Sequence, residues 1–155
     1  MRVMIREISE TNFVEAMRLE VTQEQKGFVA TNAASIAQSK FHTFLECCGI
    51  YADDVMVGFC AFGKNPDDGT AWIVRLMVAA QFQGKGYGKS GLCALIEHVQ
   101  QAYGCTSIYL DVGPDNVAAR RLYEGVGFID TGAIQGKSMI YRLDCQAMSH
   151  GPTPR

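Results

Sequence analysis

A stretch of alternating glycines carries the first chemistry that the sequence suggests. Gly84, Gly86 and Gly88 follow an apolar run that ends at Val78, and Leu92 begins a series of apolar residues at helical spacing. This order indicates a strand, a glycine loop and a helix. Glycines let the backbone turn sharply with no Cβ in the way, so several N–H groups can converge on one point. The first turn of the following helix adds unpaired N–H donors and the positive end of its dipole, which favours a phosphate or diphosphate ligand.

The spacing of the glycines distinguishes between kinds of phosphate-binding loop. A nucleotide-binding P-loop requires a glycine five positions before Gly88, and that position is Gln83. Gly86, Gly88 and Gly91 match a dinucleotide-binding pattern, but no acidic residue follows about twenty positions on in a second βαβ unit. The spacing that fits is Gln-x-x-Gly-x-Gly over residues 83–88. A glycine-rich turn with no ligand stays the alternative.

A second stretch, residues 116–128, places a tyrosine where it can act as an acid. Seven positions separate Asn116 from Tyr123, about two helical turns, so the two side chains are expected on roughly one side of a helix. A tyrosine hydroxyl has an ordinary pKa of about 10, so it holds a proton at neutral pH that it can donate to a departing anion. Tyr123 is the candidate for this proton donor. The alternative is that Tyr123 is only a half-buried aromatic residue on a helix.

Both stretches resemble those of the GNAT superfamily of N-acetyltransferases. The first resembles the loop that holds the diphosphate of acetyl-CoA, and the second fills every fixed position of the pattern N-x-x-A-x-x-L-Y-x-x-x-G-F. The resemblance implies an α/β GNAT fold with a mixed, mostly antiparallel central sheet of about 6–7 strands and helices on both faces. It also implies a splayed strand pair that holds acetyl-CoA, and direct attack by a primary amine in a ternary complex.

The resemblance also assigns residues to acetyl-CoA. The backbone of the strand before the loop would pair with pantetheine at Leu76, Met77 and Val78, because the adjacent strand splays away and leaves N–H and C=O groups free. Asn116 would contact pantetheine, and Tyr123 would lie near the thioester sulfur. The diphosphate would be held by the loop and the first helical turn: Gln83, Gly84, Lys85, Gly86, Tyr87, Gly88, Lys89 and Ser90.

A narrower resemblance suggests the acceptor. Residues 22–32, 35–38, 51–59 and 72–77 resemble segments of the Blt-type polyamine (diamine, spermidine or spermine) acetyltransferases. A small polycationic amine favours carboxylates and aromatic rings around its channel. The residues expected to line that channel are Glu20, Glu24, Asp53, Trp72 and Asp111. Each carboxylate is equally compatible with a solvated surface charge, and no single general base can be named.

Arg75 is the residue that fits this acceptor least well. An arginine near a cationic substrate repels it, unless the arginine is paired or faces elsewhere.

The expected elements follow the chain in the order β, helices, β-β-β, α, β, α, β-β. Strands are expected over 3–8, 50–52, 56–63, 71–78, 106–112, 127–129 and 139–143. Helices are expected from Asn12, from Thr22 through Val29, and over 33–44, 86–102 and 117–125. Thr22 and Gln25 have the spacing of a capping box.

Length and composition describe one ordinary globular domain. The chain has 155 residues, of which 48% are hydrophobic and 19% charged. We expect a single domain over residues 1–148 and a frayed tail over 149–155. A net charge of −2 argues against a nucleic-acid surface. The sequence has no long apolar run and no signal-peptide core, so neither membrane insertion nor secretion is expected.

The six cysteines form neither a C-x-x-C pair nor a cluster with histidine. Cys60, Cys93 and Cys105 lie in apolar segments, where a free cysteine behaves as a small hydrophobic residue. We therefore expect reduced thiols in the cytoplasm, no metal site and no covalent cysteine mechanism. The three histidines lie outside the motifs and receive no catalytic role.

The sequence therefore predicts an acetyl-CoA-dependent N-acetyltransferase that acts on a primary amine, with polyamines as the leading class. One alternative is the same fold with another acceptor, such as a protein amine, an antibiotic or an amino-acid-like metabolite. The others are a non-catalytic acyl-CoA-binding module and a P-loop nucleotide binder, which Gln83 opposes. Many enzymes of this fold are dimers, so the resemblance implies a homodimer.

Overall fold

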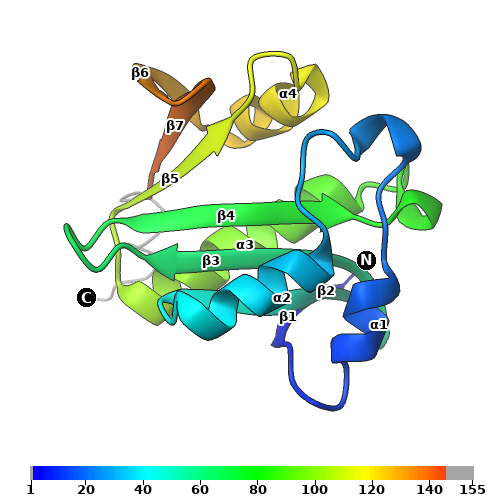
Figure 1. Cartoon of the computed structure of the whole chain (residues 1–155). Coiled ribbons are helices and arrows are strands. Elements are labelled where there is room, and N and C mark those ends of the chain that lie inside the picture. Colours follow the sequence, from blue (N-terminus) through cyan, green and yellow to red (C-terminus); the bar gives the residue numbers. More distant parts are fainter. Residues whose placement is uncertain (1, 146–155) are drawn as a thin grey trace, which may run out of the picture.

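A seven-stranded sheet forms the centre of the computed structural model, which describes residues 2–145 (Figure 1). The strand order is β1-β2-β3-β4-β5-β7-β6, and every neighbouring pair is antiparallel except the parallel pair of β4 and β5. The tail expected over 149–155 lies outside the described residues. The strands are β1 (Val3–Glu7), β2 (Leu45–Ala52), β3 (Val55–Lys64), β4 (Ala71–Val78), β5 (Ser107–Val112), β6 (Ile129–Gln135) and β7 (Ser138–Asp144).

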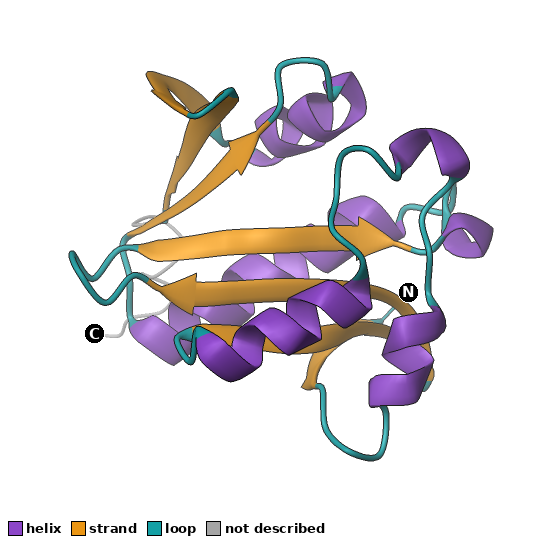
Figure 2. Cartoon of the chain, viewed as in Figure 1, coloured by secondary structure: helices purple, strands orange, loops and turns teal. Residues whose placement is uncertain are grey.

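Helices cover both faces of this sheet (Figure 2). α3 (Tyr87–Tyr103) contributes Leu92, Leu95, Ile96 and Val99 to the core on one face. α1 (Phe13–Arg18) and α2 (Asn32–Phe41) contribute to a second core that contains Phe59 and Met77. Neighbouring residues of β3 belong to different cores, because successive side chains of a strand point to opposite faces. α4 (Val117–Val126) follows β5. Within residues 2–145, no helix is long and apolar enough to cross a membrane.

The parallel strands β4 and β5 are paired only where they begin. The register joins Ala71 to Ile108 and Trp72 to Tyr109, and no later pair joins these strands within the described chain. β4 then bulges, because its pairing with β3 skips Val74. From there the strands separate, and β5 runs with β7 and α4 away from β4 (Figure 1). The predicted mostly antiparallel α/β sheet with a splayed strand pair is confirmed.

Three predicted elements differ from the structure. The helix expected from Thr22 through Val29 is a single 3-10 turn, η1 (Gln23–Gln25). The capping box does form, because Gln25 Oε1 accepts from the Thr22 N–H at 3.1 Å, but Gly27 follows at once and disfavours a helix. The strand expected over 50–52 begins at Leu45, because pairing with β3 outweighs a weak local propensity. The strand expected over 127–129 instead spans Ile129–Gln135, where it pairs with β7.

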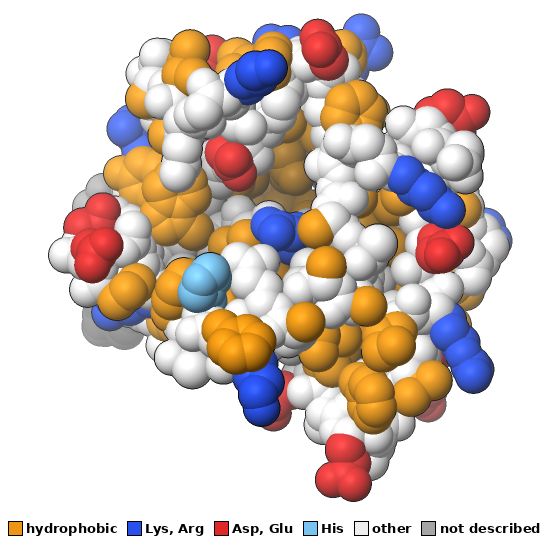
Figure 3. All heavy atoms as spheres, viewed as in Figure 1, with side chains coloured by type: hydrophobic (Ala, Val, Ile, Leu, Met, Phe, Trp, Pro, Cys, Tyr) orange, Lys and Arg blue, Asp and Glu red, His pale blue; other side chains and the backbone are white. Residues whose placement is uncertain are grey.

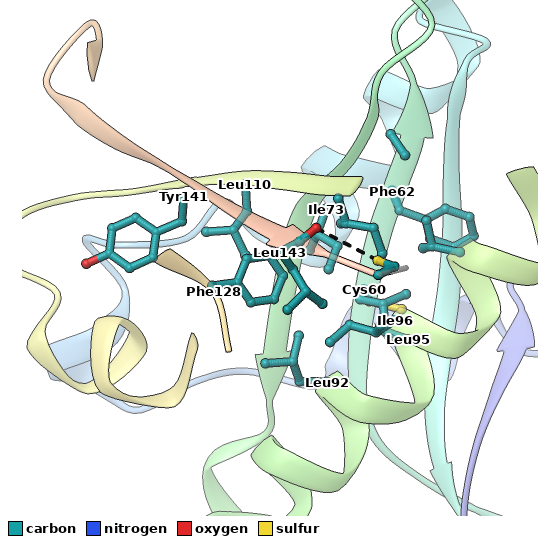
Figure 4. Close-up of a cluster of buried hydrophobic side chains, with 14 of the residues drawn as sticks. Cys60, Phe62, Ile73, Leu92, Leu95, Ile96, Leu110, Phe128, Tyr141 and Leu143 are labelled. Carbon is teal, nitrogen blue, oxygen red and sulfur yellow. Dashed lines mark hydrogen bonds between the residues drawn. The ribbon is translucent and has the colours of Figure 1, made fainter. Parts of the chain in front are cut away.

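The core beneath α3 is closely packed and includes buried thiols. Figure 4 shows Leu92, Leu95 and Ile96 of α3 facing side chains of the sheet. Cys60 Sγ donates to Cys48 O at 3.6 Å, and burial raises the pKa of Cys48 to about 12 and that of Cys60 well above its ordinary value. All six cysteines are free thiols. The buried ones therefore stay neutral at physiological pH and act as small hydrophobic residues.

Gly58 allows β3 and β4 to approach closely. A Cβ at this position would lie 2.3 Å from the carbonyl oxygen of Met77, so the backbone would have to shift. We expect Gly58→Ala to lower the free energy of unfolding by about 1–3 kcal/mol, the usual range for overpacking, in chemical denaturation. Gly27→Ala is the control, because nothing lies within 4 Å of the added Cβ. Equal stability of the two variants would contradict this prediction.

Candidate functional site

The separation of β4 from β5 opens a cleft of about 560 Å³, called the cleft below. Figure 3 shows the surface hollowed between the part that carries β5 and α4 and the part that carries β4. Strand β4 and the glycine loop form one side of the cleft, and the end of β5 with α4 forms the other. Eight of the residues predicted to bind acetyl-CoA line it: Leu76, Met77, Val78, Gln83, Gly84, Gly88, Asn116 and Tyr123.

Among residues 2–145, no strand neighbours the cleft-facing edge of β4 beyond Trp72, because β4 is paired there only with β3. Backbone N–H and C=O groups that lose water without gaining a partner cost free energy. Two carbonyls along this strand accept from side chains: Val78 O from Gln83 Nε2 at 2.9 Å, and Val74 O from Arg75 Nη1 at 3.0 Å. An extended ligand that carries amides can pair with the rest of such an edge as an added strand does.

The glycine loop enters α3 with free backbone N–H groups. Gly84 and Gly86 have positive φ angles of 78° and 87°, which residues with a Cβ rarely adopt. The first helical hydrogen bond of α3 runs from Ser90 N to Gly86 O at 3.1 Å. The N–H groups of the first helical turn therefore have no helical acceptor and can bind an anion. Of the predicted loop residues, five lie beside the cleft without lining it: Lys85, Gly86, Tyr87, Lys89 and Ser90.

Helix α4 carries the predicted acid into the cleft. Asn116 caps the helix, because its side chain accepts from the Ala119 N–H at 3.3 Å. Tyr123 lies about two turns further on, half-buried, with its ring edge-on to Phe128 at a centroid distance of 5.8 Å. Burial, and then the charge of Asp111, raise the pKa of Tyr123 to about 12. The hydroxyl therefore keeps its proton at neutral pH and is available as a donor.

The segment between α1 and α2 forms an outer wall of the cleft. Val21, Gln25 and Phe28 line the cleft from this segment. Gln25 and Gln83 form a reciprocal amide pair, with N···O distances of 2.8 and 3.3 Å. The pair ties the wall to the glycine loop.

Three residues predicted to bind the acceptor do not line a cavity. Glu20 forms an exposed ion pair with Lys26 at 3.5 Å, and Glu24 is exposed on η1. The expected helix is only one 3-10 turn, on which Glu24 does not line the cleft, and Glu20 precedes this turn and does not line the cleft either. Asp53 lies in the turn between β2 and β3, where its carbonyl oxygen accepts from Arg6 Nη2 at 3.1 Å. This turn is remote from the point where β4 and β5 separate.

A second cavity of about 460 Å³, called the side cavity below, adjoins the cleft. The two cavities share Val74, Arg75 and Asp111. Trp72 lines the side cavity and stacks on Tyr109 at a centroid distance of 5.3 Å. The predicted acceptor residues Trp72 and Asp111 are thus brought together at one site.

Sequence reasoning missed several lining residues that come from loops. Phe28 lines the cleft, and Phe44 and Asp67 line the side cavity. Phe28 and Phe44 are 50% and 41% exposed. A large aromatic residue within a polar segment is the sequence feature that could have predicted both as lining residues. Asp67 could not have been predicted as a lining residue, because the turn of residues 65–69 is rich in polar residues and nothing distinguishes Asp67 from them.

Comparison with known proteins agrees with this geometry. A family model described as the acetyltransferase (GNAT) family matches residues 5–128. The chain belongs to the GNAT acetyltransferase family. This membership confirms the predicted recognition and makes the protein an acetyltransferase, which sets aside the P-loop alternative.

Named relatives of this GNAT protein act on different amines. The spermine/spermidine N(1)-acetyltransferase of Bacillus subtilis is 30% identical over 140 residues, which cover 86% of this chain and 92% of the relative. The solved spermidine N-acetyltransferase of Vibrio cholerae, in complex with CoA and spermine, has a TM-score of 0.69 at 17% identity and covers 90% of this chain and 92% of its own. A solved aminoglycoside acetyltransferase in complex with coenzyme A and kanamycin has a TM-score of 0.79 at 20% identity, covering 98% and 100%. The two structural likenesses show the shared fold.

The amide pair of Gln25 and Gln83 gives a test of the wall. We expect Gln25→Ala and Gln83→Ala to be coupled in a double-mutant cycle of unfolding free energies, by about 0.5–1.5 kcal/mol, because each variant removes the same pair of hydrogen bonds. Gln100→Ala, whose side chain bonds the distant Cys145 carbonyl, serves as the uncoupled control. Additive effects of Gln25→Ala and Gln83→Ala would show that the wall is not tied to the loop.

Proposed function

We propose that this GNAT protein transfers the acetyl group of acetyl-CoA to a primary amine, with polyamines as the leading acceptor class. The observation that carries the proposal is the junction of the two cavities. The cleft offers a free strand edge, a glycine loop and a protonated Tyr123, and the side cavity offers aromatic rings and carboxylates. Because both cavities are lined by Arg75 and Asp111, an amine in the side cavity can reach a thioester in the cleft.

The residues of the cleft fit acetyl-CoA. The backbone of Leu76, Met77 and Val78 would pair with the pantetheine amides. The N–H groups of residues 84–89 would hold the diphosphate, with Lys85 and Lys89 as nearby positive charges. The Asn116 amide has a free –NH₂ group beyond its capping oxygen, which suits a pantetheine carbonyl. Bound there, acetyl-CoA supplies an activated acetyl thioester.

The transfer forms one C–N bond and breaks one C–S bond. The neutral amine nitrogen attacks the carbonyl carbon, the sulfur departs with the electron pair of the C–S bond, and the Tyr123 hydroxyl donates a proton to it. The nitrogen loses the extra proton that it carries after the attack. The Asp111 carboxylate, which borders both cavities, is positioned to accept that proton through water. Tyr123 then regains its proton from solvent.

Two observations support a polyamine as the acceptor. The side cavity combines Phe44 and Trp72 with the carboxylates of Asp67 and Asp111, and rings and anions together favour ammonium groups. The relative at 30% identity is a spermine/spermidine acetyltransferase. An aminoglycoside, which is also polycationic, is the second acceptor to test, because the enzyme that acetylates it shares the fold.

Three further expectations stay predictions: a single domain over residues 1–148, a homodimer and a cytoplasmic location. They follow from the family resemblance and composition given above.

The acceptor class is tested by the mass of the products after incubation with acetyl-CoA and a panel of amines. The panel contains spermidine, spermine, short diamines, lysine peptides and aminoglycosides. We expect acetylated spermidine and spermine, because a second ammonium can reach the carboxylates of the side cavity. Preferential acetylation of an aminoglycoside or a peptide would replace the polyamine. Binding of CoA without any acetylated product would favour an acyl-CoA-binding module.

The role of Tyr123 is tested by Tyr123→Phe. We expect kcat to fall by about 10²–10⁴-fold, because the departing sulfur loses its proton donor. Tyr109→Phe is the control, since Tyr109 lines neither cavity and phenylalanine keeps the stack on Trp72. Because the pKa of Tyr123 is raised to about 12, the wild-type kcat should not decline through tyrosine ionisation as the pH rises to about 10. Unchanged turnover of Tyr123→Phe would exclude Tyr123 as the acid.

A further inference from the structure

Arg75 occupies the junction of the cleft and the side cavity and lines both. Its partner on β3 is Ala61, which belongs to the core beneath α1 and α2. Side chains of directly paired residues lie on one face of a sheet, so Arg75 points toward α2. There its Nη2 donates to Gln38 Oε1 at 3.2 Å, and its Nη1 donates to the Val74 carbonyl at 3.0 Å. Both acceptors are neutral.

The charge of this half-buried guanidinium has no anionic partner within residues 2–145. The ion pairs found there join Arg6 to Asp54, Lys26 to Glu20 and Arg142 to Asp144. The Arg75 Nε atom is buried and has no hydrogen-bond partner in this part of the chain. Because arginine stays protonated in proteins, a positive charge that forms no ion pair within residues 2–145 stands where the two cavities meet.

A cation at this point opposes the binding of an ammonium ion, but it favours the chemical step. Only a neutral amine has the lone pair that attacks a carbonyl, and a primary alkyl amine has a pKa of about 10, so it enters mainly as a cation. A nearby like charge disfavours the charged form of an ionisable group. We propose that Arg75 keeps the acceptor nitrogen at the junction in its neutral, nucleophilic form, while the remaining ammonium groups of the acceptor lie toward the carboxylates of the side cavity. The inference rests on the amine acetylation proposed above.

Among the titratable groups that the structure describes around the junction of the two cavities, Arg75 is the one that carries a positive charge. Asp111 of β5 and Asp67 of the β3–β4 turn are exposed, so water screens their charges more than that of Arg75. Burial raises the pKa values of Cys47 on β2 and Tyr123 on α4, and both stay neutral. Tyr109 of β5 stacks on Trp72. His42, after α2, contacts Arg75 only through Gln38, with a distance of 3.2 Å between His42 Nδ1 and Gln38 Nε2.

The pH dependence of kcat at saturating acetyl-CoA and spermidine tests the role of Arg75, since kcat reports the ionisation of groups in the bound complex. At acidic pH, kcat rises with pH as the bound amine loses its proton, and this part of the profile is called the acidic limb. We expect the acidic limb to lie about 1 pH unit or more higher in Arg75→Met, because the bound amine then holds its proton more tightly. At a pH below the acidic limb, kcat of Arg75→Met should be about tenfold or more lower than that of the wild-type protein, and at high pH the two values of kcat should converge. Arg75→Lys keeps a positive charge and should keep the limb near its wild-type position. A limb that is unmoved in Arg75→Met, or moved equally in Arg75→Lys, overturns the inference.

A second readout is independent of turnover. Calorimetric titration of the CoA complex with spermidine, in buffers of different ionisation enthalpy, counts the protons released on binding. We expect the wild-type protein and Arg75→Lys to release more protons than Arg75→Met at neutral pH. If the wild-type protein releases more protons than Arg75→Met on binding spermidine but does not acetylate it, the proposed function fails, while the effect of Arg75 on the protonation of the bound amine stands. Equal release in all three proteins overturns the role of Arg75 alone, and no binding of any amine overturns both.

Two control variants separate the charge of Arg75 from its structural contacts. Arg6→Met removes a surface guanidinium that pairs with Asp54 and lines neither cavity, so it should leave the limb in place. Gln38→Leu removes the neutral partner of Arg75 and keeps the charge, so it should alter the limb less than Arg75→Met. Thermal melting confirms that each variant is folded before its profile is compared. A shift in Arg6→Met as large as in Arg75→Met would make the effect a general loss of positive charge and would overturn the inference.

Discussion

The two-residue pairing of β4 with β5 is the constraint on which the rest of the structure depends. A parallel pair in the middle of a sheet normally has hydrogen bonds along its whole length, but here it ends at Trp72 and Tyr109. The bulge at Val74 follows directly, and β5 retains β7 on its other edge. The backbone of β4 beyond this point is therefore left to a ligand, and the glycine loop, α4 and the segment before α2 all meet around the gap.

The site that results has opposite requirements on its two sides. In the proposed reaction, the cleft would bind an anionic cofactor and protonate a leaving sulfur, and free N–H groups and a neutral tyrosine suit these two tasks. In the reaction proposed above, the side cavity would hold a polycation and would deliver one nitrogen without its proton. Aromatic rings and Asp67 in the side cavity, with Arg75 and Asp111 at the junction, would separate these tasks in space. Arg75 opposes the binding of an ammonium group, but it would favour the neutral amine that attacks the thioester, so its presence is consistent with the proposed cationic acceptor.

Much of the fold and of the cofactor side could be predicted from the sequence, because those features depend on local spacing. The glycines at Gly84 and Gly86 encode a turn with positive φ angles that residues with a Cβ rarely adopt, and the interval from Asn116 to Tyr123 is fixed by the helical period. The apolar runs that form β3 and β4 are read from composition alone. In these places local chemistry and tertiary structure agree, so the sequence was sufficient.

The acceptor side was decided by tertiary structure. Thr22 and Gln25 form their capping box, yet Gly27 disfavours a helix and the amide pair with Gln83 holds the segment as a wall of the cleft. Glu24 is exposed on this segment, and Glu20, which precedes it, pairs with Lys26. Trp72 and Asp111, which are distant in sequence, meet only because β4 and β5 start side by side and then diverge. The sequence by itself determined the family and placed the glycine loop and Tyr123 in segments that line the cleft. The position of Arg75 beside both cavities depends on strand register and on Gln38 of α2, contacts between distant segments that no local pattern encodes.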